Sequence, residues 1–255
     1  MLRLANTSPY KGINFDEMET GSDILSADTW YHIAVVNNGG TRRLYIGGKP
    51  ETLTGTAQTT QANSDPVRIG SDFGGRYFGG RLDEVRLWSV ARTQTQIQTY
   101  MHKVLNGDEA GLVAYYRFDH ASGNALSEYT SGDHNGTLKN MSDADWVRSE
   151  ASVGDRSHVG TGLDSLSENS EVPVDMVWDA GGDPGAEAVF AAIQVEEEPD
   201  GVTGLLAHYP STYWELWISH NDAFQVDVTF HYDAIGGIGD EAALKLYTRS
   251  GPGGS

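Results

Sequence analysis

Apolar positions in the first part of the chain come in short runs bounded by turn-forming residues. Residues 30–36 are apolar or aromatic on both alternating faces, which is typical of a strand buried within a sandwich. Residues 37–40 (Asn-Asn-Gly-Gly) follow, and they predict a hairpin turn because Asn and Gly tolerate a positive φ. Residues 42–46 then form the expected returning strand, which ends at the Gly-Gly pair of residues 47–48.

Similar runs at residues 67–70, 78–88 and 112–118 predict further strands. Residues 93–101 differ, because Ile97, Tyr100 and Met101 recur at helical spacing and predict one short helix at an end of the sheet. We therefore expect an all-β, antiparallel fold with a single helix over residues 1–148.

The composition changes at residues 149–171, which are rich in Ser, Gly, Asp and Glu and which we interpret as a linker. Residues 172–255 then predict a second β-rich module, resembling a sandwich. Residues 224–232 alternate between apolar and polar side chains, as in a half-buried antiparallel strand, and residues 213–218 and 244–247 are similar candidates.

The chain is strongly acidic, with 36 Asp and Glu against 17 Lys and Arg and a formal net charge of −19. This charge would repel phosphate backbones and anionic headgroups, so we expect neither nucleic acid nor a membrane surface as a partner. It favours divalent cations instead. The acidic run at residues 196–201 is interpreted as a solvated turn, with a cation site as the alternative. No run of about 18 apolar residues is present, so no membrane insertion is expected.

Four motifs occur in order: Trp30-Tyr31-His32-Ile33-Ala34, Leu44-Tyr45-Ile46-Gly47-Gly48, Val67-Arg68-Ile69-Gly70 and Phe78-Gly79-Gly80-Arg81-Leu82-Asp83-Glu84-Val85-Arg86-Leu87-Trp88. Together with the helical segment that follows, they resemble the laminin-G-like (concanavalin-A-like) jelly-roll family over about residues 1–102. The resemblance implies an antiparallel β-sandwich. Residues 111–147 are similar both to segments that follow such domains and to the start of a next domain, and both alternatives stay open.

The family has several strands before its Trp-His segment, whereas 29 residues precede Trp30 here. We therefore expect the laminin-G-like domain of residues 1–148 to be incomplete at its N-terminus, which would also account for the missing signal peptide. The module at 172–255 is expected to be incomplete at its C-terminus. The absence of cysteine excludes disulfides and cysteine zinc sites, and it favours a bacterial origin for an extracellular protein.

The concanavalin-A-like fold also hosts glucanases, which carry Glu-x-Asp-x-x-Glu on one strand, and this pattern is absent here. Asp83 and Glu84 are adjacent in a predicted strand, so we expect them to point to opposite faces and to be unable to flank one bond. We therefore predict no catalytic residue. Asp83 would lie on a largely apolar face, where it needs backbone N–H donors or, alternatively, a metal ion.

Related domains often bind calcium through loop carboxylates, so the resemblance implies a metal site. Asp72 lies in a Gly-rich loop that resembles the pentraxin calcium loop, although the further acidic residues of pentraxins are missing. Asp72 and Asp83 are the candidate metal ligands, Asp65 is a weaker one, and a plain loop carboxylate is the alternative for Asp72. The eight histidines do not cluster at metal-ligand spacing.

The resemblance implies a non-catalytic binding or adhesion module of an extracellular bacterial protein, with a carbohydrate or protein ligand at the cell surface and assistance from calcium. Two alternatives remain open at this point. One is a structural spacer in a long adhesin, and the other is an accessory region of a glycoside hydrolase whose catalytic domain lies elsewhere.

Overall fold

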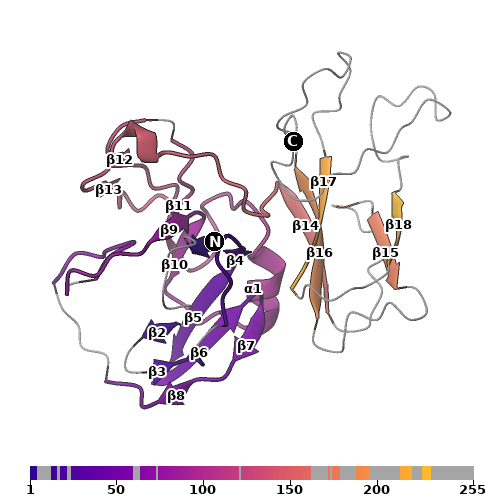
Figure 1. Cartoon of the computed structure of the whole chain (residues 1–255), viewed down its shortest axis with the longest axis horizontal. Helices are drawn as coiled ribbons and strands as arrows, with labels where there is room; N and C mark the ends of the chain where they lie inside the picture. Colours follow the sequence, from indigo (N-terminus) through magenta and orange to yellow (C-terminus); the bar gives the residue numbers. More distant parts are fainter. Residues whose placement is uncertain are drawn as a thin grey trace. The chain divides into compact units, whose positions relative to one another are not determined.

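The computed structural model describes residues 1–4, 13–15, 18–21, 24–59, 64–72, 74–120, 122–161, 172, 174–178, 188–195, 213–219 and 226–230. Every pair of strands among them is antiparallel, and they contain one α-helix, so the all-β fold expected from the sequence is confirmed (Figure 1). The chain divides into a first unit (Met1–Ile97 and Leu105–Ala151) and a second unit (Gln98–Val104 and Ser152–Ser255). No helix of the described residues is long and apolar enough to cross a membrane.

A three-stranded meander of β5 (Ile33–Asn38), β6 (Thr41–Ile46) and β7 (Lys49–Glu51) forms the centre of the first unit. Its first turn is made by Gly39 and Gly40, whose φ angles of 57° and 87° require the left-handed region that glycine adopts without strain. The predicted hairpin at residues 37–40 is therefore present. Helix α1 (Gln94–Tyr100) packs onto this sheet through Ile97, which is buried with Val36 and Tyr45.

The described residues of the first unit contain further short strands. Two of its sheets have three strands each: β4 (Trp30–Tyr31), β1 (Leu2–Leu4) and β9 (Gly80–Leu82) in this order, and β2 (Asn14–Phe15), β3 (Met18–Glu19) and β8 (Thr54–Gly55) in this order. In two-stranded sheets, β10 (Val85–Trp88) pairs with β11 (Leu112–Tyr116), and β12 (Ala125–Leu126) pairs with β13 (Gly136–Thr137); a 3₁₀ helix, η1, spans Asp143–Asp145. β11 pairs with β10 in a two-stranded sheet, and residues 112–116 lie in the first unit.

Three strand predictions in the first unit differ from the structure. Residues 30–36 are not one strand buried on both faces, because β4 and β5 belong to different sheets and Val35 is 52% exposed. Residues 67–70 form no strand, and an isolated bridge pairs Ser71 with Tyr77 just after them. Residues 78–88 are not one strand, because the extended backbone breaks between β9 and β10, where Glu84 has a φ of 53°. Strict alternation of side chains requires a continuous extended backbone, so it fails across this break.

The described residues of the second unit form two sheets. One consists of β14 (Arg156–Thr161), β16 (Val189–Val195) and β17 (Tyr213–Ile218), and the other of β15 (Val174–Trp178) and β18 (Val226–Phe230). All seven residues of β16 are buried. One face of this strand packs through Phe190 and Ala192 against Val174 and Met176 of the second sheet. The opposite face buries Ile193 with neighbours that include Trp217. A strand buried on both faces accounts for the uninterrupted apolar run of its sequence.

Strand β14 lies inside the segment 149–171 that we interpreted as a linker, so the structure differs from that expectation at Arg156–Thr161. Gly160 explains the difference, since a Cβ at this position would approach the ring of Phe190 to 2.3 Å. The glycine that suggests a loop in the sequence is therefore required for close packing of two strands. The predicted acidic turn at 196–201 and the predicted strand at 244–247 lie outside the described residues.

Candidate functional site

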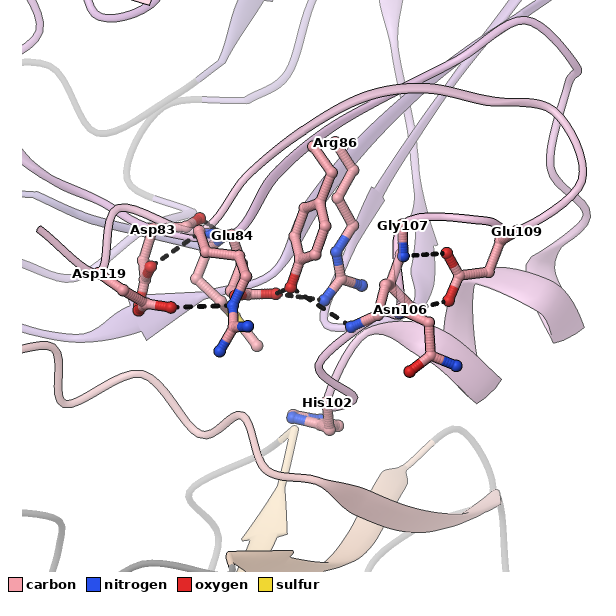
Figure 2. Close-up of polar contacts among 12 residues, drawn as sticks. Asp83, Glu84, Arg86, His102, Asn106, Gly107, Glu109 and Asp119 are labelled. Atoms are coloured by element: carbon pink, nitrogen blue, oxygen red, sulfur yellow. Dashed lines mark hydrogen bonds and ion pairs between the residues drawn. The ribbon is translucent and has the colours of Figure 1, made fainter. Parts of the chain in front are cut away.

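A buried polar network joins β10 to β11 in the first unit. The Tyr115 hydroxyl donates a hydrogen bond of 2.6 Å to Oε2 of Glu84, and Arg86 forms an ion pair of 2.5 Å with the same oxygen (Figure 2). Tyr115 is fully buried, and the Glu84 and Arg86 side chains are nearly so. Burial, and then the negative charge of Glu84, raise the pKa of the Tyr115 hydroxyl, which therefore remains a donor.

Asp83 and Glu84 do not lie in a strand as expected, because they fall between β9 and β10, where Glu84 has a left-handed backbone. Both residues are buried, with exposed fractions of 8% and 9%. Asp83 Oδ1 accepts a hydrogen bond of 2.9 Å from the Glu84 N–H group, which is the kind of backbone partner that a buried carboxylate needs. Burial, assisted by the nearby Glu84 charge, raises the pKa of Asp83 to about 6.

Asp72 holds together a hairpin in the Gly-rich loop. Its Oδ1 atom accepts hydrogen bonds of 2.9 Å from the N–H groups of Gly74 and Arg76, and its Oδ2 atom accepts one from the Arg76 guanidinium. These contacts, led by the Arg76 N–H bond, lower the pKa of Asp72. These contacts hold the loop together, and a calcium ion at this site would have to compete with the Arg76 guanidinium for the Asp72 carboxylate.

The two candidate metal ligands belong to different local networks, Asp72 to the Arg76 hairpin and Asp83 to the buried pair with Glu84. Asp65, the weaker candidate, is exposed. Among the residues that the structure describes, no group of three or more His, Asp or Glu side chains is placed to hold a metal ion.

A surface depression of about 400 Å³ lies at the turn end of the β5–β6 hairpin. It is lined by Asn37, Gly39, Gly40 and Arg42 and by residues 57–59 (Ala-Gln-Thr), and we call it the polar depression. Its volume is in the range of ligand sites. The Arg42 guanidinium connects the two sides of the depression. It donates one hydrogen bond to the Asn37 side-chain oxygen and another, of 3.1 Å, to the backbone oxygen of Gln58.

The polar depression was not foreseen from the sequence. One side of it is the Asn-Asn-Gly-Gly segment, whose local sequence predicts the hairpin that the structure contains. The other side comes from residues 57–59, which have no regular structure and are joined to the hairpin by a contact 16 residues apart in the chain. A hydrogen bond to a backbone carbonyl carries no signature in the sequence.

Comparisons with known proteins bear on the first unit. Residues 4–98 match the family model of the concanavalin A-like lectin/glucanases superfamily. A solved structure, that of a candidate carbohydrate-binding protein from Bacteroides ovatus ATCC 8483, is 30% identical in sequence over 47% of this chain. The match spans 39% of that protein, and its TM-score of 0.38 is too low for the structural likeness to carry an argument. No curated protein matches the chain. The match over residues 4–98 agrees with the laminin-G-like resemblance that the sequence motifs indicated.

Proposed function

We propose that the first unit is a non-catalytic carbohydrate-binding module of an extracellular bacterial protein and that the polar depression is its binding site. The observation that carries the proposal is the lining of this depression. It combines the amide of Asn37, the guanidinium of Arg42, a hydroxyl at Thr59 and open glycine backbone in a volume of about 400 Å³. Groups of this kind exchange hydrogen bonds with the hydroxyls of a sugar.

The absence of catalysis is part of the proposal. A glycosidase needs two carboxyl groups that face one bond across a site open to substrate. In the described part of the first unit, the adjacent carboxylates of Asp83 and Glu84 are buried, and Glu84 is engaged by Arg86 and Tyr115. Turnover of a β-glucan that Glu84→Gln or Asp83→Asn abolishes would contradict this view and assign an enzyme instead.

The binding proposal is tested by titrating the full chain with a panel of neutral and acidic oligosaccharides in a calorimeter. We expect saturable binding that Asn37→Ala weakens about fivefold, the usual effect of losing one hydrogen bond. Asn38→Ala is the matched control, because Asn38 is the neighbouring exposed residue of the same strand and does not line the depression. If no saccharide binds to the folded protein, the proposal fails, and the spacer alternative is favoured.

A further inference from the structure

We infer that Asn38 is a site of spontaneous covalent modification, at which the side-chain amide closes onto the backbone nitrogen of Gly39 and is lost as ammonia. The inference goes beyond the proposed function and does not depend on it. Asparagine is a thermolabile residue, and it reacts most readily before glycine, whose missing side chain leaves the backbone nitrogen accessible. The chain contains three Asn-Gly pairs, at residues 38–39, 106–107 and 135–136.

The reaction requires the Gly39 nitrogen to reach the Cγ atom of Asn38. A C–N bond forms there, and the side-chain amide group leaves as ammonia with the proton that the Gly39 nitrogen gives up, so that a five-membered succinimide ring remains. Water then opens the ring. Attack at Cγ gives aspartate, whereas attack at the main-chain carbonyl gives isoaspartate, in which the main chain runs through the Cβ and Cγ atoms of residue 38. The two steps consume one water molecule and oxidise nothing.

The structure leaves the pair at 38–39 open to this reaction. Asn38 is exposed at the end of β5 and forms the last pair of the hairpin with Thr41. In the described part of the chain, no residue hydrogen-bonds the Asn38 side chain or the Gly39 N–H group. No heavy atom lies within 4 Å of the position that a Cβ would take at Gly39. Ring closure needs a change in the Asn38 backbone, and an exposed hairpin end opens at low cost.

At residues 106–107, the attacking nitrogen is engaged instead. The Gly107 N–H group donates a hydrogen bond of 3.0 Å to one oxygen of Glu109, and the Asn106 N–H group donates one of 2.9 Å to the other oxygen (Figure 2). The nitrogen must give up its proton to attack, and a bond to a carboxylate holds this proton strongly. The backbone is also packed closely, because a Cβ at Gly107 would lie 2.0 Å from the Tyr129 backbone oxygen.

At residues 135–136, both the amide and the backbone are engaged. The Asn135 side-chain oxygen accepts a hydrogen bond of 2.9 Å from the Glu128 N–H group, and its nitrogen donates one of 3.2 Å to Asp133. Gly136 belongs to β13, where it pairs with Leu126. Reorienting the amide for attack therefore breaks two hydrogen bonds and disturbs a strand pair. The fold thus protects two of the three Asn-Gly pairs and leaves Asn38 reactive.

The modification would change the turn that forms one side of the polar depression. Isoaspartate inserts one extra main-chain carbon before Gly39, and a two-residue hairpin turn depends on a fixed backbone geometry. Gly39 and Gly40, which line the depression, are therefore displaced even though the Asn38 side chain does not line it. This consequence, unlike the modification itself, rests on the proposed function: the isoaspartate form should bind saccharide more weakly.

The test incubates the full chain in mildly alkaline buffer, folded and separately unfolded in guanidinium chloride, and follows the three Asn-Gly peptides by mass spectrometry with fragmentation that distinguishes isoaspartate from aspartate. In the folded protein, we expect Asn38 to react roughly tenfold faster than Asn106 and Asn135, whose reaction first breaks hydrogen bonds. In the unfolded chain, the three should react at similar rates. Glu109→Ala should raise the rate at Asn106 severalfold and leave Asn38 unchanged, and Asp108→Ala, at the exposed neighbouring position, is the matched control.

Each outcome decides a separate step. Equal rates at the three pairs in the folded protein overturn the inference, and so does an unmodified Asn38 under conditions in which the unfolded chain reacts. Aspartate without isoaspartate overturns the ring mechanism. A rate at Asn106 that does not rise in Glu109→Ala overturns the protective role of Glu109; should this variant unfold, the folded and unfolded forms of the unchanged protein decide. If no saccharide binds to fresh protein, the proposed function fails and the modification stands. Full affinity of the isoaspartate form overturns its consequence for binding alone.

Discussion

The Tyr115 hydroxyl lies 2.6 Å from Oε2 of Glu84, and these two residues are 31 positions apart in the chain. The same carboxylate oxygen is paired with Arg86, whose guanidinium also lies 5.3 Å from the centre of the Tyr115 ring. A buried charge is tolerated only when it is paired and hydrogen-bonded, so the three side chains depend on one another.

Loss of the Arg86 charge should therefore destabilise the first unit strongly. We expect Arg86→Met to lower the free energy of unfolding by about 3–5 kcal/mol, because it leaves the Glu84 carboxylate buried without its cation. Arg81→Met is the matched control, since the Arg81 side chain is 39% exposed and lies 3.8 Å from Glu150. Its loss should cost roughly 1 kcal/mol or less in denaturant unfolding.

A second change distinguishes an unpaired charge from a loss of packing. The double variant Glu84→Gln/Arg86→Met removes both charges, so it should recover part of the stability lost in Arg86→Met. Tyr115→Phe removes the hydrogen bond that the hydroxyl donates to Glu84 and the one it accepts from the Leu105 N–H group, and it leaves the ion pair. We expect it to cost about 1–3 kcal/mol. Equal stability of the single and double variants would contradict the interpretation that the unpaired carboxylate causes the loss.

The elements that the sequence predicted correctly are those that local residues determine. The β5–β6 hairpin is an example, because its turn depends on Gly39 and Gly40 and its strands on adjacent apolar runs. The strand break at Glu84 is different. Glu84 has a left-handed backbone and contacts Arg86 and Tyr115. Tyr115, on β11, is remote from Glu84 in the sequence. The pattern of residues 78–88 alone favours a continuous strand.

Strand β14 and the polar depression were missed for the same reason. Gly160 suggests a loop until Phe190 is known to pack against it. Arg42 suggests an ordinary solvated side chain until the backbone oxygen of Gln58 is known to accept from it. In each case the decisive partner comes from another part of the chain, so single-sequence periodicity cannot supply it.

Calcium binding at Asp72 remains a prediction, and the hairpin contacts sharpen its test. Calcium that binds only the folded protein raises the melting midpoint by mass action, relative to the same protein with chelator. Asp72→Ala should abolish this rise. Arg76→Ala should increase it, because the Arg76 guanidinium no longer competes for the carboxylate. If calcium and chelator give equal midpoints for the unchanged protein and for Arg76→Ala, the site does not exist at this loop.

His102 should be essential to the second unit, in which it is fully buried. Its ring centre lies 4.4 Å from that of Trp217, and its Nδ1 atom lies 2.7 Å from the Ser152 carbonyl oxygen. His102→Ala removes this packing and leaves a cavity, which should cost about 2–4 kcal/mol. Hydrogen exchange of the peptides that cover β14 and β16 provides the measurement, with the exposed His134→Ala as control. Unchanged protection of β14 and β16 in His102→Ala would show that residues 98–104 are dispensable for the second unit.

The pKa of Asp83 predicts an unusual dependence of stability on pH. Because the folded-state pKa is raised to about 6, the folded protein binds the proton more tightly than the unfolded chain does. The stability that Asp83 contributes is therefore fully present below about pH 4, the ordinary pKa of the group, and is lost as the pH rises through 6. Above pH 6, the ionised carboxylate destabilises the buried site by a constant amount.

Asp83→Asn tests this dependence, because asparagine resembles the protonated carboxyl group and can still accept the Glu84 N–H bond. We expect the variant to melt higher than the unchanged protein at pH 7.5 and nearly equally at pH 4. Asp145→Asn is the control of opposite sign, since hydrogen bonds from Ser142 lower the pKa of Asp145. That change should lower the midpoint slightly at pH 7.5, and less as the pH falls. A midpoint of Asp83→Asn that stays below that of the unchanged protein at pH 7.5 would mean that the Asp83 charge stabilises the fold, and the assigned pKa direction would be wrong.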